Sequence, residues 1–286
     1  MSLPNISVVT PSFNAAAYLE DAILSVKRQE RVEVEHIVVD GASADETVRL
    51  LQRQTHVRWI SEPDRGQSDA INKGFLMATG DLVGWLNADD DYLPGALEAI
   101  ARAAGEHPEA DVIHGDCIFV DPSGRIVRSK VEHDFDPQVL LYFGCYIPST
   151  STFFRRRLIE QGLLLDCDYR VAMDFEFFVR LARLGCRFQY VPQFIAAFRW
   201  HQDNVSLRNV QRRTEERREV QRAATGYERP AWQLETLRYW ARARRLARKT
   251  ATGNIAREIR IRGKRGFDTR WMRAPQLLPW QDLPSW

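Results

Sequence analysis

The stretch that decides the fold lies within the first ninety residues and consists of four short apolar runs. They are ISVVT (6–10), HIVVD (36–40), VRWIS (57–61) and LVGWL (82–86). Each run is bounded by turn-forming residues, which is typical of strands that are buried on both faces. Between the runs the periodicity is helical: residues 19–26 repeat apolar side chains at i, i+3, i+4 and i+7. Strands that alternate with helices predict right-handed βαβ units and a mainly parallel sheet.

Turn and cap signals place the boundaries of the predicted helices. Ser43 and Glu46 have the S-x-x-E spacing of a capping box. Ser68 stands where it can cap the next helix, and Gly80 where it can end that helix. We therefore expect helices that begin directly after Ser43 and Ser68.

The second half of the sequence is less regular. A turn signal at 121–124 separates two strand patterns and predicts a hairpin. Residues 172–184 are predicted to be helical, and residues 187–191 and 195–199 are predicted to be two late strands. From about residue 205 onward, helix formers and arginine dominate, so we expect this stretch to be a separate helical extension.

Composition indicates a globular protein with a sizeable core. The chain has 286 residues, of which 44% are apolar and 27% are charged. Four cysteines share no C-x-x-C spacing, so they are expected to be ordinary reduced thiols. No apolar run approaches the roughly 20 residues that span a bilayer, and the N-terminus lacks the features of a signal peptide. We therefore expect a cytoplasmic chain.

The net charge of +2 conceals a strong polarity along the chain. Residues 1–200 contain 20 Lys and Arg against 29 Asp and Glu, a net charge of −9. Residues 201–286 contain 20 against 9, a net charge of +11. An acidic body with a basic tail suggests that the two parts have different tasks.

Polar clusters follow each of the first four predicted strands. They are Thr10-Pro11-Ser12-Phe13-Asn14, Asp40-Gly41, Glu62-Pro63-Asp64-Arg65-Gly66 and Asn87-Ala88-Asp89-Asp90-Asp91. In open α/β sheets, ligands bind beyond the carboxyl ends of the strands. Carboxylates that share one edge repel each other unless they are compensated. We therefore expect a bound cation and a polyvalent ligand at this edge.

Several competing chemistries have no motif in the chain. There is no G-x-x-x-x-G-K-[ST] loop, and no G-x-G-x-x-G follows the first strand. Neither H-E-x-x-H nor G-x-S-x-G occurs. The remaining possibility is an aspartate-based site.

Three motifs in order resemble those of the inverting family 2 glycosyltransferases, which have the GT-A fold. They are Thr10-Pro-Ser-Phe-Asn14, Val39-Asp-Gly-Ala-Ser-Ala-Asp45 and Asn87-Ala-Asp-Asp90 followed by Pro94. The resemblance covers roughly residues 5–200. It implies a catalytic domain over residues 1–204, with a nucleotide-binding half (1–91), an acceptor-side half (92–204) and a basic extension (205–286). It also implies transfer of a sugar from a nucleotide-diphosphate-sugar donor, such as a UDP-sugar, to a hydroxyl of a glycan or lipid-linked acceptor in envelope or exopolysaccharide synthesis.

The same resemblance assigns roles at the nucleotide end. Asp40 matches the residue that reads the base, and Asp89 matches a ligand of Mn²⁺ or Mg²⁺. Asn87 departs from the family pattern, where Asp is frequent, so metal affinity is expected to be weaker. Arg65 is expected to contact phosphate. The residues expected to bind the nucleotide-sugar are Thr10, Pro11, Ser12, Phe13, Asn14, Asp40, Gly41, Arg65, Gly66, Ser68, Asp69, Asn87 and Ala88.

Asp174 matches the catalytic aspartate of the family, and Met173 replaces the usual acidic neighbour. An inverting transfer needs such a base near the acceptor hydroxyl; the alternative is that Asp174 simply caps a helix. His201 matches a histidine near the diphosphate and metal, although a lone histidine is as often structural. Residues 146–154 resemble the acceptor-side loop. His114 and Asp116 share one strand face, but a pair is thin evidence for a metal, so we expect them to be structural.

Two other functions remain open from the sequence. A sugar-1-phosphate nucleotidyltransferase would share an α/β nucleotide fold, but it would be expected to carry a Gly-rich basic loop after the first strand. A non-catalytic relative that binds a glycan or partner enzyme is kept open by Asn87 and Met173.

The basic extension has three interpretations. Residues 234–248 form a Trp-bearing basic helical pattern. It can pack on the catalytic domain, lie on an anionic membrane surface, or bind nucleic acid, for which no motif joins the charge. We expect packing first, peripheral membrane contact second, and no nucleic acid partner.

Overall fold

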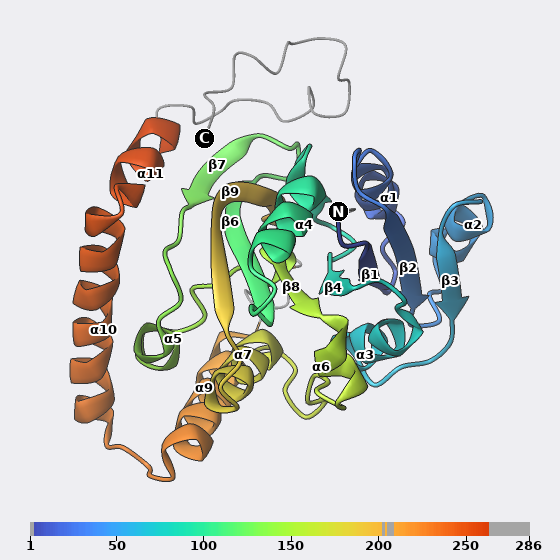
Figure 1. Ribbon diagram of the computed structural model, residues 1–286. Coiled ribbons are helices and arrows are strands. Elements are labelled where there is room, and N and C mark those ends of the chain that lie inside the picture. Colours follow the sequence, from blue (N-terminus) through green and yellow to red (C-terminus); the bar gives the residue numbers. More distant parts are fainter. Residues whose placement is uncertain (1–2, 202–203, 205–208, 263–286) are drawn as a thin grey trace.

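A mixed sheet forms the centre of the computed structural model, which describes residues 3–201, 204 and 209–262 (Figure 1). The strands are β1 (Ile6–Ser12), β2 (Val34–Asp40), β3 (Arg58–Ser61), β4 (Leu82–Trp85), β5 (Asp91–Tyr92), β6 (Val112–Val120), β7 (Ile126–Lys130), β8 (Thr152–Arg155) and β9 (Phe188–Arg199). Their order is β3-β2-β1-β4-β8-β6-β9-β5, and β7 pairs with β6. The first four strands are parallel, as predicted, and β5, β7 and β8 are antiparallel to their neighbours.

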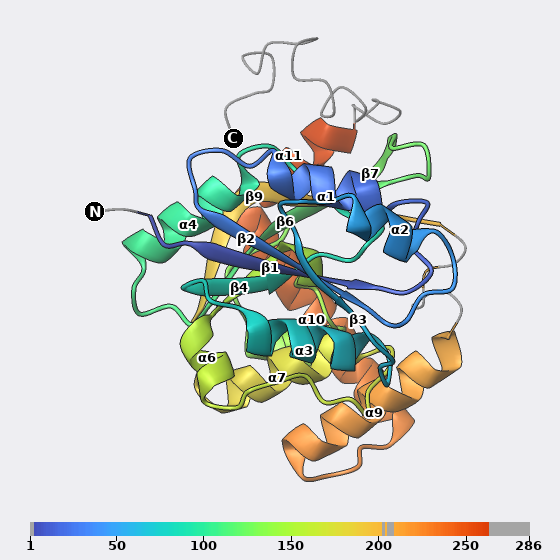
Figure 2. The ribbon, with the colours of Figure 1, turned by 90° about the vertical axis from the view of Figure 1, so that its right-hand side faces the viewer.

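Helices cover both faces of this sheet (Figure 2). They are α1 (Leu19–Lys27), α2 (Thr47–Gln52), α3 (Gln67–Met77), α4 (Ala96–Glu106), α5 (Pro137–Phe143), α6 (Arg156–Glu160), α7 (Met173–Arg183), α9 (Val210–Thr225), α10 (Ala231–Ala251) and α11 (Asn254–Arg262). Because successive strand residues point to opposite faces, Val8 packs in the core under α1 and α4, while Val9 packs with α3 and α7. The result is the three-layered α/β architecture that the sequence predicts.

Two predicted helix caps are wrong. Helix α2 begins at Thr47, and the Ser43 hydroxyl donates to the Asp40 carboxylate at 2.5 Å instead of capping the helix. Ser68 lies inside α3, which begins at Gln67 and ends before Gly80. In both places a buried polar partner competes successfully with the helix end for the serine hydroxyl.

The two late strands predicted near the end of the catalytic domain form one strand, β9. Gly115 on β6 pairs with Val191, but the next residue, Asp116, pairs with Phe194. Pro192 and Gln193 are therefore the extra residues of a bulge, which lets the strand continue through a proline that would otherwise interrupt it. The predicted hairpin at 121–124 is present between β6 and β7.

The described part of the basic extension packs on residues 3–201 through ion pairs to buried acids. Arg245 of α10 contacts the fully buried Glu132 at 2.8 Å, and Arg257 of α11 contacts the fully buried Asp116 at 3.0 Å. The buried Asp136 accepts from two further arginines of α10. A buried carboxylate requires such a partner, so the opposite charges of body and tail reflect intramolecular docking. Residues 205–208 and 263–286 of the predicted extension lie outside the described residues.

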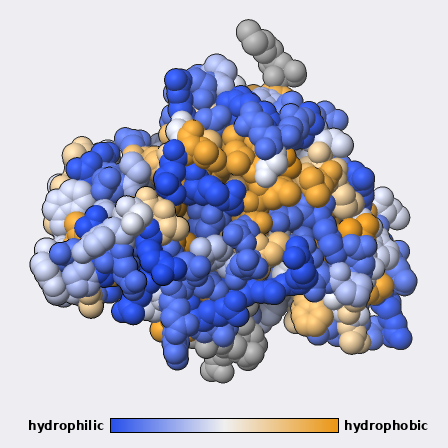
Figure 3. Space-filling view, turned by 90° about the horizontal axis from the view of Figure 1, so that it is seen from below, coloured by the Kyte–Doolittle hydropathy of each residue, from blue (hydrophilic) through white to orange (hydrophobic). Residues whose placement is uncertain are grey.

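The surface is mainly hydrophilic. Seen from below, hydrophobic residues gather in a band across the upper middle of the molecule, with charged and polar residues around it (Figure 3). Among the described helices, none combines the length and apolar character that crossing a membrane requires. All four cysteines are free thiols.

Candidate functional site

The carboxyl ends of β1, β2 and β4 bring the predicted nucleotide-binding segments to one edge of the sheet. Ser12 at the end of β1 pairs with Asp40 at the end of β2. The Leu86 amide, directly after β4, donates to the Val9 carbonyl of β1. Because these strands are parallel neighbours, the loops that follow them lie next to each other.

Asp40 is fully buried, and its carboxylate accepts three hydrogen bonds from the chain. The amide and hydroxyl of Ser43 donate to it at 2.9 and 2.5 Å, and the Ser61 hydroxyl donates at 2.7 Å. Such bonds fix the orientation of the carboxylate. Ser43 and Ser61 are therefore positioning residues for Asp40 that the sequence analysis missed.

An exposed aromatic ring lies beside Asp40. Phe13 is 66% exposed, and its ring lies next to Gly41. A Cβ added to Gly41 would lie 2.5 Å from a carboxylate oxygen of Asp64, so any larger residue at 41 would require the Asp64 side chain to move. The Asn14 amide oxygen accepts from the Ala44 amide and thereby ties the loop after β1 to the loop after β2. Phe13, Gly41 and Asp64 thus form one polar and aromatic surface.

Other predicted nucleotide-binding residues use their side chains inside the protein. The Thr10 hydroxyl is buried and bonds His36 at 2.9 Å. The Ser68 hydroxyl bonds the Met173 sulfur at 3.0 Å. Arg65 forms an exposed ion pair with Asp69 at 3.3 Å. These side chains are not gathered around Asp40, and any contact by Thr10 or Ser68 with a ligand would have to come from the backbone.

The loop after β4 is held by a network of amides and carboxylates. The Asn87 side chain accepts from Gln67 at 2.7 Å and donates to Asp90 at 2.8 Å. Burial and the neighbouring Asp89 carboxylate raise the pKa of Asp90 well above its usual value. The Asn87 side chain therefore hydrogen-bonds the buried Asp90, while the Asp89 side chain remains partly exposed.

Arg199, at the end of β9, compensates this acidic loop. It is 1% exposed. Its guanidinium donates to the Asp89 carbonyl at 2.9 Å and to the Asp91 carboxylate at 2.8 Å, and its amide donates to Asp90 at 2.9 Å. Arg199 therefore contacts all three consecutive aspartates, and its guanidinium neutralises the carboxylate of Asp91. The chain itself thus compensates part of the acidic loop, and the expected bound cation remains a prediction for Asp89.

Asp89 and His201 meet at the edge of this loop. The Asp89 carboxylate and the His201 ring nitrogen are 2.8 Å apart, and the Asn204 amide donates to the same carboxylate oxygen at 3.3 Å. The His201 ring stacks on Tyr18 with centroids 5.4 Å apart. A carboxylate oxygen and an imidazole nitrogen can serve as metal ligands. Among the described residues, no group of three or more His, Cys, Asp or Glu side chains is arranged as a metal cage.

Asp174 lies in a second part of the site, a cavity of about 370 Å³. The cavity is lined by Cys117, Phe119, Lys130, Cys145, Ile147, Pro148, Ser149, Thr150, Ala172, Asp174, Phe175, Phe198, Trp200, Asn204, Arg213 and Arg217. Residues 147–150 belong to the segment that resembles an acceptor-side loop. Asn204 joins the two parts of the site, since it lines this cavity and also contacts Asp89.

Asp174 is not the N-cap of its helix. Helix α7 begins at Met173 with Ala172 as the N-cap, and Asp174 accepts a hydrogen bond from the adjacent Phe175 amide at 2.7 Å and another from the Cys145 thiol. Burial raises the pKa of Asp174 above its usual value, against the opposing effects of this amide and of Lys130. A carboxylate with a raised pKa is a stronger base.

Helix α9 positions the start of α7. The carboxylate of Glu216 accepts from the amides of Arg170, Val171 and Ala172 at 2.7–3.0 Å. Burial alone would raise the pKa of Glu216, but these amides and Arg212 together lower it below its usual value. Because α9 also supplies Arg213 and Arg217 to the cavity, the first helix of the predicted extension takes part in the candidate site.

The residues that sequence reasoning missed share one feature: they come from segments remote from the motifs. Arg199 had a weak sequence signal, an arginine at the end of an otherwise apolar strand. Lys130, Glu216 and Arg217 had none, because their role depends on which elements pack together. His114 and Asp116 are fully buried, and Asp116 pairs with Arg257, in line with the structural role predicted for this pair.

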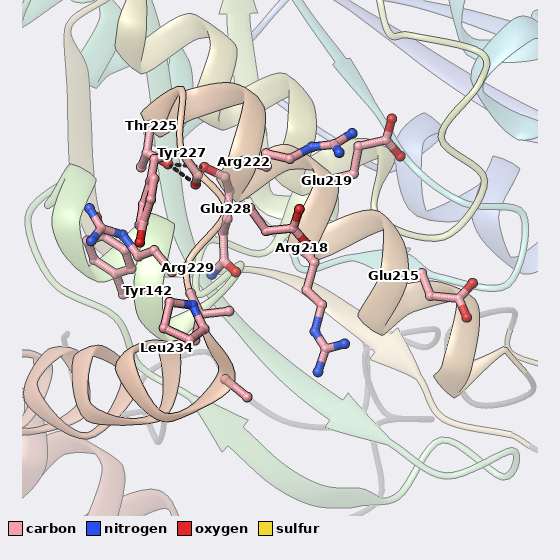
Figure 4. A pocket seen from close by; sticks show the side chains of 13 residues that line it. Tyr142, Glu215, Arg218, Glu219, Arg222, Thr225, Tyr227, Glu228, Arg229 and Leu234 are labelled. Atoms are coloured by element: carbon pink, nitrogen blue, oxygen red, sulfur yellow. Dashed lines mark hydrogen bonds between the residues drawn. The ribbon is translucent and has the colours of Figure 1, made fainter.

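A larger hollow lies away from these residues. It measures about 870 Å³ and is formed where α9 turns into α10. Arg229 lies beside the rings of Tyr142 and Tyr227, while Glu215 and Arg218 point outward from α9 (Figure 4). Its side chains of both charges form no convergent set around one point, so the Asp89 and Asp174 regions are the stronger candidate.

Comparisons with known proteins agree with this arrangement. A family model described as glycosyl transferase family 2 matches residues 7–179. An uncharacterised glycosyltransferase of Mycobacterium tuberculosis is 32% identical over 189 residues, which cover 63% of this chain and 70% of the relative. A PGL/p-HBAD biosynthesis glycosyltransferase of Mycobacterium bovis is 33% identical over 186 residues, with the same coverage.

Solved structures share the fold. Residues 1–349 of S. aureus TarS in complex with UDP-GlcNAc match with a TM-score of 0.64 and 18% identity, over 86% of this chain and 73% of that one. The mannosyltransferase PcManGT of Pyrobaculum calidifontis, in complex with GDP-Man and Mn²⁺, matches with a TM-score of 0.60 and 19% identity, over 88% and 76%. A longer TarS chain is covered to 37%.

Proposed function

Because the chain belongs to glycosyltransferase family 2, we propose that it transfers one sugar from a nucleotide-diphosphate-sugar donor to an acceptor hydroxyl with inversion at the anomeric carbon. The observation that carries this proposal is that Asn204 connects the Asp89–His201 pair to the cavity that contains Asp174. A leaving diphosphate at Asp89 and His201 and an acceptor in the Asp174 cavity would lie on opposite sides of the anomeric carbon.

The nucleoside is assigned to the surface formed by Phe13, Gly41 and Asp64 above Asp40. An exposed ring can stack on a base, and buried or half-buried carboxylates can accept its N–H groups. The two structural neighbours were solved in complex with UDP-GlcNAc and with GDP-Man, which supports a nucleotide-sugar as the donor. Asp40 is buried beneath this surface, and the hydroxyls of Ser43 and Ser61 hold its carboxylate in place.

The pair Asp89 and His201 would hold Mn²⁺ or Mg²⁺. Their donor atoms fit such an ion, and the remaining coordination positions would be filled by diphosphate oxygens and water. When bound, the ion would offset charge on the departing diphosphate. Asp89 stays available because Arg199 bonds its backbone carbonyl and leaves its carboxylate to His201 and Asn204.

Asp174 is assigned as the base. It would accept the proton of the acceptor hydroxyl as that oxygen bonds to the anomeric carbon and the carbon–diphosphate bond breaks. Because burial raises its pKa, Asp174 is a stronger base than an ordinary aspartate. Glu216 is a positioning residue, because it fixes the three amides that precede α7.

We also propose that the product belongs to envelope or exopolysaccharide glycans and that the protein contacts an anionic membrane. One relative is named for PGL biosynthesis. On the outer face of α10, Trp232, Tyr239 and Leu246 are exposed at intervals of seven residues, and Arg238 and Arg242 are exposed on the same helix. Aromatic and basic side chains on one helix face suit an anionic lipid surface.

Nucleotide binding tests the central proposal. UDP, GDP and dTDP are titrated into the full chain by calorimetry, with and without Mn²⁺. We expect one of them to bind, and to bind more tightly with the metal; Asp89→Asn should remove that metal dependence. Arg102→Gln on the exposed side of α4 serves as the control. If no nucleotide binds, the proposal is wrong.

A second experiment tests membrane contact. Full-length protein is sedimented with liposomes that contain phosphatidylglycerol and with neutral phosphatidylcholine liposomes. We expect pelleting with the anionic liposomes, and a loss of pelleting when Trp232, Tyr239 and Leu246 are all replaced by serine. Equal pelleting of the variant and the parent would contradict the membrane proposal. Truncation at residue 204 is unsuitable, because it would strip buried Glu132 and Asp136 of their arginine partners.

The family match favours a glycosyltransferase over a nucleotidyltransferase.

Measuring the turnover of the donor sugar distinguishes an enzyme from a non-catalytic relative. If a donor sugar is transferred or hydrolysed by the parent, and Asp174→Asn lowers this rate, the protein is a catalyst. If nucleotide binds but no sugar is released under any acceptor condition, the non-catalytic alternative is favoured.

A further inference from the structure

Among the described residues that line the cavity around Asp174, cations outnumber carboxylates. Lys130 of β7 and Arg217 of α9 line it, and Asp174 is the one acid of this described lining. Within the described part of the chain, the Lys130 side chain forms no hydrogen bond and no ion pair, although it lies close enough to influence the charge on Asp174. A neutral sugar hydroxyl does not require such a surplus of cations.

The positive charge of Arg217 is not balanced by its hydrogen-bond and ring contacts, because both are with neutral groups. Its guanidinium donates to the Phe143 carbonyl at 3.1 Å and lies over the Phe175 ring at 5.7 Å. Its Nε is buried without a hydrogen-bond partner. A buried, partly unsatisfied guanidinium is costly unless a ligand completes its bonding.

We propose that the acceptor is an acidic glycoside, with a carboxylate or phosphate group that binds Lys130 and Arg217 while its hydroxyl faces Asp174. This inference rests on the proposed glycosyl transfer. The aromatic residues Phe198 and Trp200 in the same cavity supply apolar surface for the faces of a sugar ring. The acceptor class is thus set by charge, and the hydroxyl to be activated is set by Asp174.

The donor diphosphate is a less suitable occupant for these cations. It has its own place at Asp89 and His201, on the other side of Asn204. Lys130 and Arg217 come instead from elements that pack around the acceptor-like loop, residues 147–150. If these cations bind the acceptor, replacing Lys130 should weaken binding of the acidic glycoside. If they bind the donor diphosphate, replacing Lys130 should weaken binding of the nucleotide.

The test compares three glycosides that differ at C6: octyl β-D-glucoside, octyl β-D-glucuronide and the 6-phosphate of octyl β-D-glucoside. Binding to the full chain is measured by ligand-observed NMR at low salt, with and without the nucleotide that binds. We expect at least one acidic glycoside to bind about tenfold more tightly than the neutral one, as one charged contact contributes. Which acidic glycoside binds distinguishes a carboxylate from a phosphate.

Variants locate the effect. Lys130→Gln should reduce the preference for the acidic glycoside to about twofold or less, with unchanged nucleotide binding. Arg218→Gln, on the exposed side of α9 next to Arg217, is the matched control and should keep the full preference. Equal binding of acidic and neutral glycosides, no binding of either acidic glycoside, or a preference that Lys130→Gln leaves unchanged would each overturn the inference.

Failure of this inference is separable from failure of the proposed function. If nucleotide binds and sugar is released, but the acidic and neutral glycosides bind equally, only the acceptor class is wrong. If Lys130→Gln weakens nucleotide binding instead of glycoside binding, the cations serve the donor, and the inference is overturned while the transferase proposal stands.

Discussion

Replacing Arg199 by methionine tests whether one buried cation organises the acidic loop after β4. The side chain is 1% exposed and donates to the Asp89 carbonyl at 2.9 Å, the Pro122 carbonyl at 3.2 Å and the Asp91 carboxylate at 2.8 Å. Methionine fills most of the volume but donates none of these bonds. The variant therefore isolates the electrostatic role of Arg199 from its packing.

The expected loss is large compared with the stability of a domain. Removing one partner of a buried ion pair costs about 3–5 kcal/mol, against a total of about 5–15 kcal/mol for a typical domain. We expect Arg199→Met to lower the free energy of unfolding, measured by urea denaturation, by about 3–5 kcal/mol. Adding Asp91→Asn should restore part of the loss, because that carboxylate no longer needs a cation.

Arg102→Met is the matched control, because the Arg102 side chain is 61% exposed on α4 and its partner Glu98 keeps a second arginine, Arg31, at 3.9 Å. Exposed pairs contribute about 0–1 kcal/mol, so this variant should unfold almost as the parent does. If Arg199→Met and Arg102→Met lose similar amounts, the loop does not depend on the buried cation. Because Arg199 bonds the Asp89 backbone, we also expect Arg199→Met to weaken metal-dependent nucleotide binding.

Three further variants address the extension and the base. Arg245→Met leaves the buried Glu132 without its partner, so urea denaturation should show a loss of about 3 kcal/mol that Glu132→Gln in the same chain partly reverses; an unchanged midpoint would contradict docking through this pair. Glu216→Gln weakens the bonds to three amides ahead of α7, and we expect a loss of about 2 kcal/mol with a lower kcat and little change in nucleotide affinity. Asp174→Asn should lower kcat by about 10²–10⁴ without weakening nucleotide binding. Because burial raises the pKa of Asp174, the parent should lose activity, as pH falls, at a higher pH than an ordinary carboxylate would; a parent profile with no such acid limb would argue against Asp174 as the base.

Much of the fold of residues 1–91 was predictable because the signals in this stretch are local. The β1 to β4 runs and the helical periodicity of residues 19–26 agree with the structure, since burial on both faces requires apolar residues in each strand. Asp40, Asn87 and Asp89 fall at strand ends, where the topology places ligands. The assignment of roles to these residues remains a prediction.

Predictions that relied on local hydrogen bonding were less successful. Ser43 and Ser68 have cap-like spacing, yet the Ser43 hydroxyl donates to Asp40 and accepts from the Asn14 amide, and the Ser68 hydroxyl bonds to groups of Tyr169 and Met173. The bulge at Pro192 likewise joined two predicted strands, because β6 could pair on both sides of it. Asn14, Tyr169, Met173 and strand β6 all lie outside a local sequence window, so the window cannot weigh them against the local alternative.

By itself, the sequence determined the order of strands and helices, the acidic edge of the sheet and the charge contrast between body and tail, because each follows from residue type and spacing along the chain. Tertiary structure alone decided that Arg199 compensates the acidic loop, that α9 brings Glu216 and Arg217 to the cavity of Asp174, and that the tail's arginines reach buried acids. The physical reason is that a buried charge is stable only next to its partner, and these partners are brought together by the packing of segments that lie far apart in the chain.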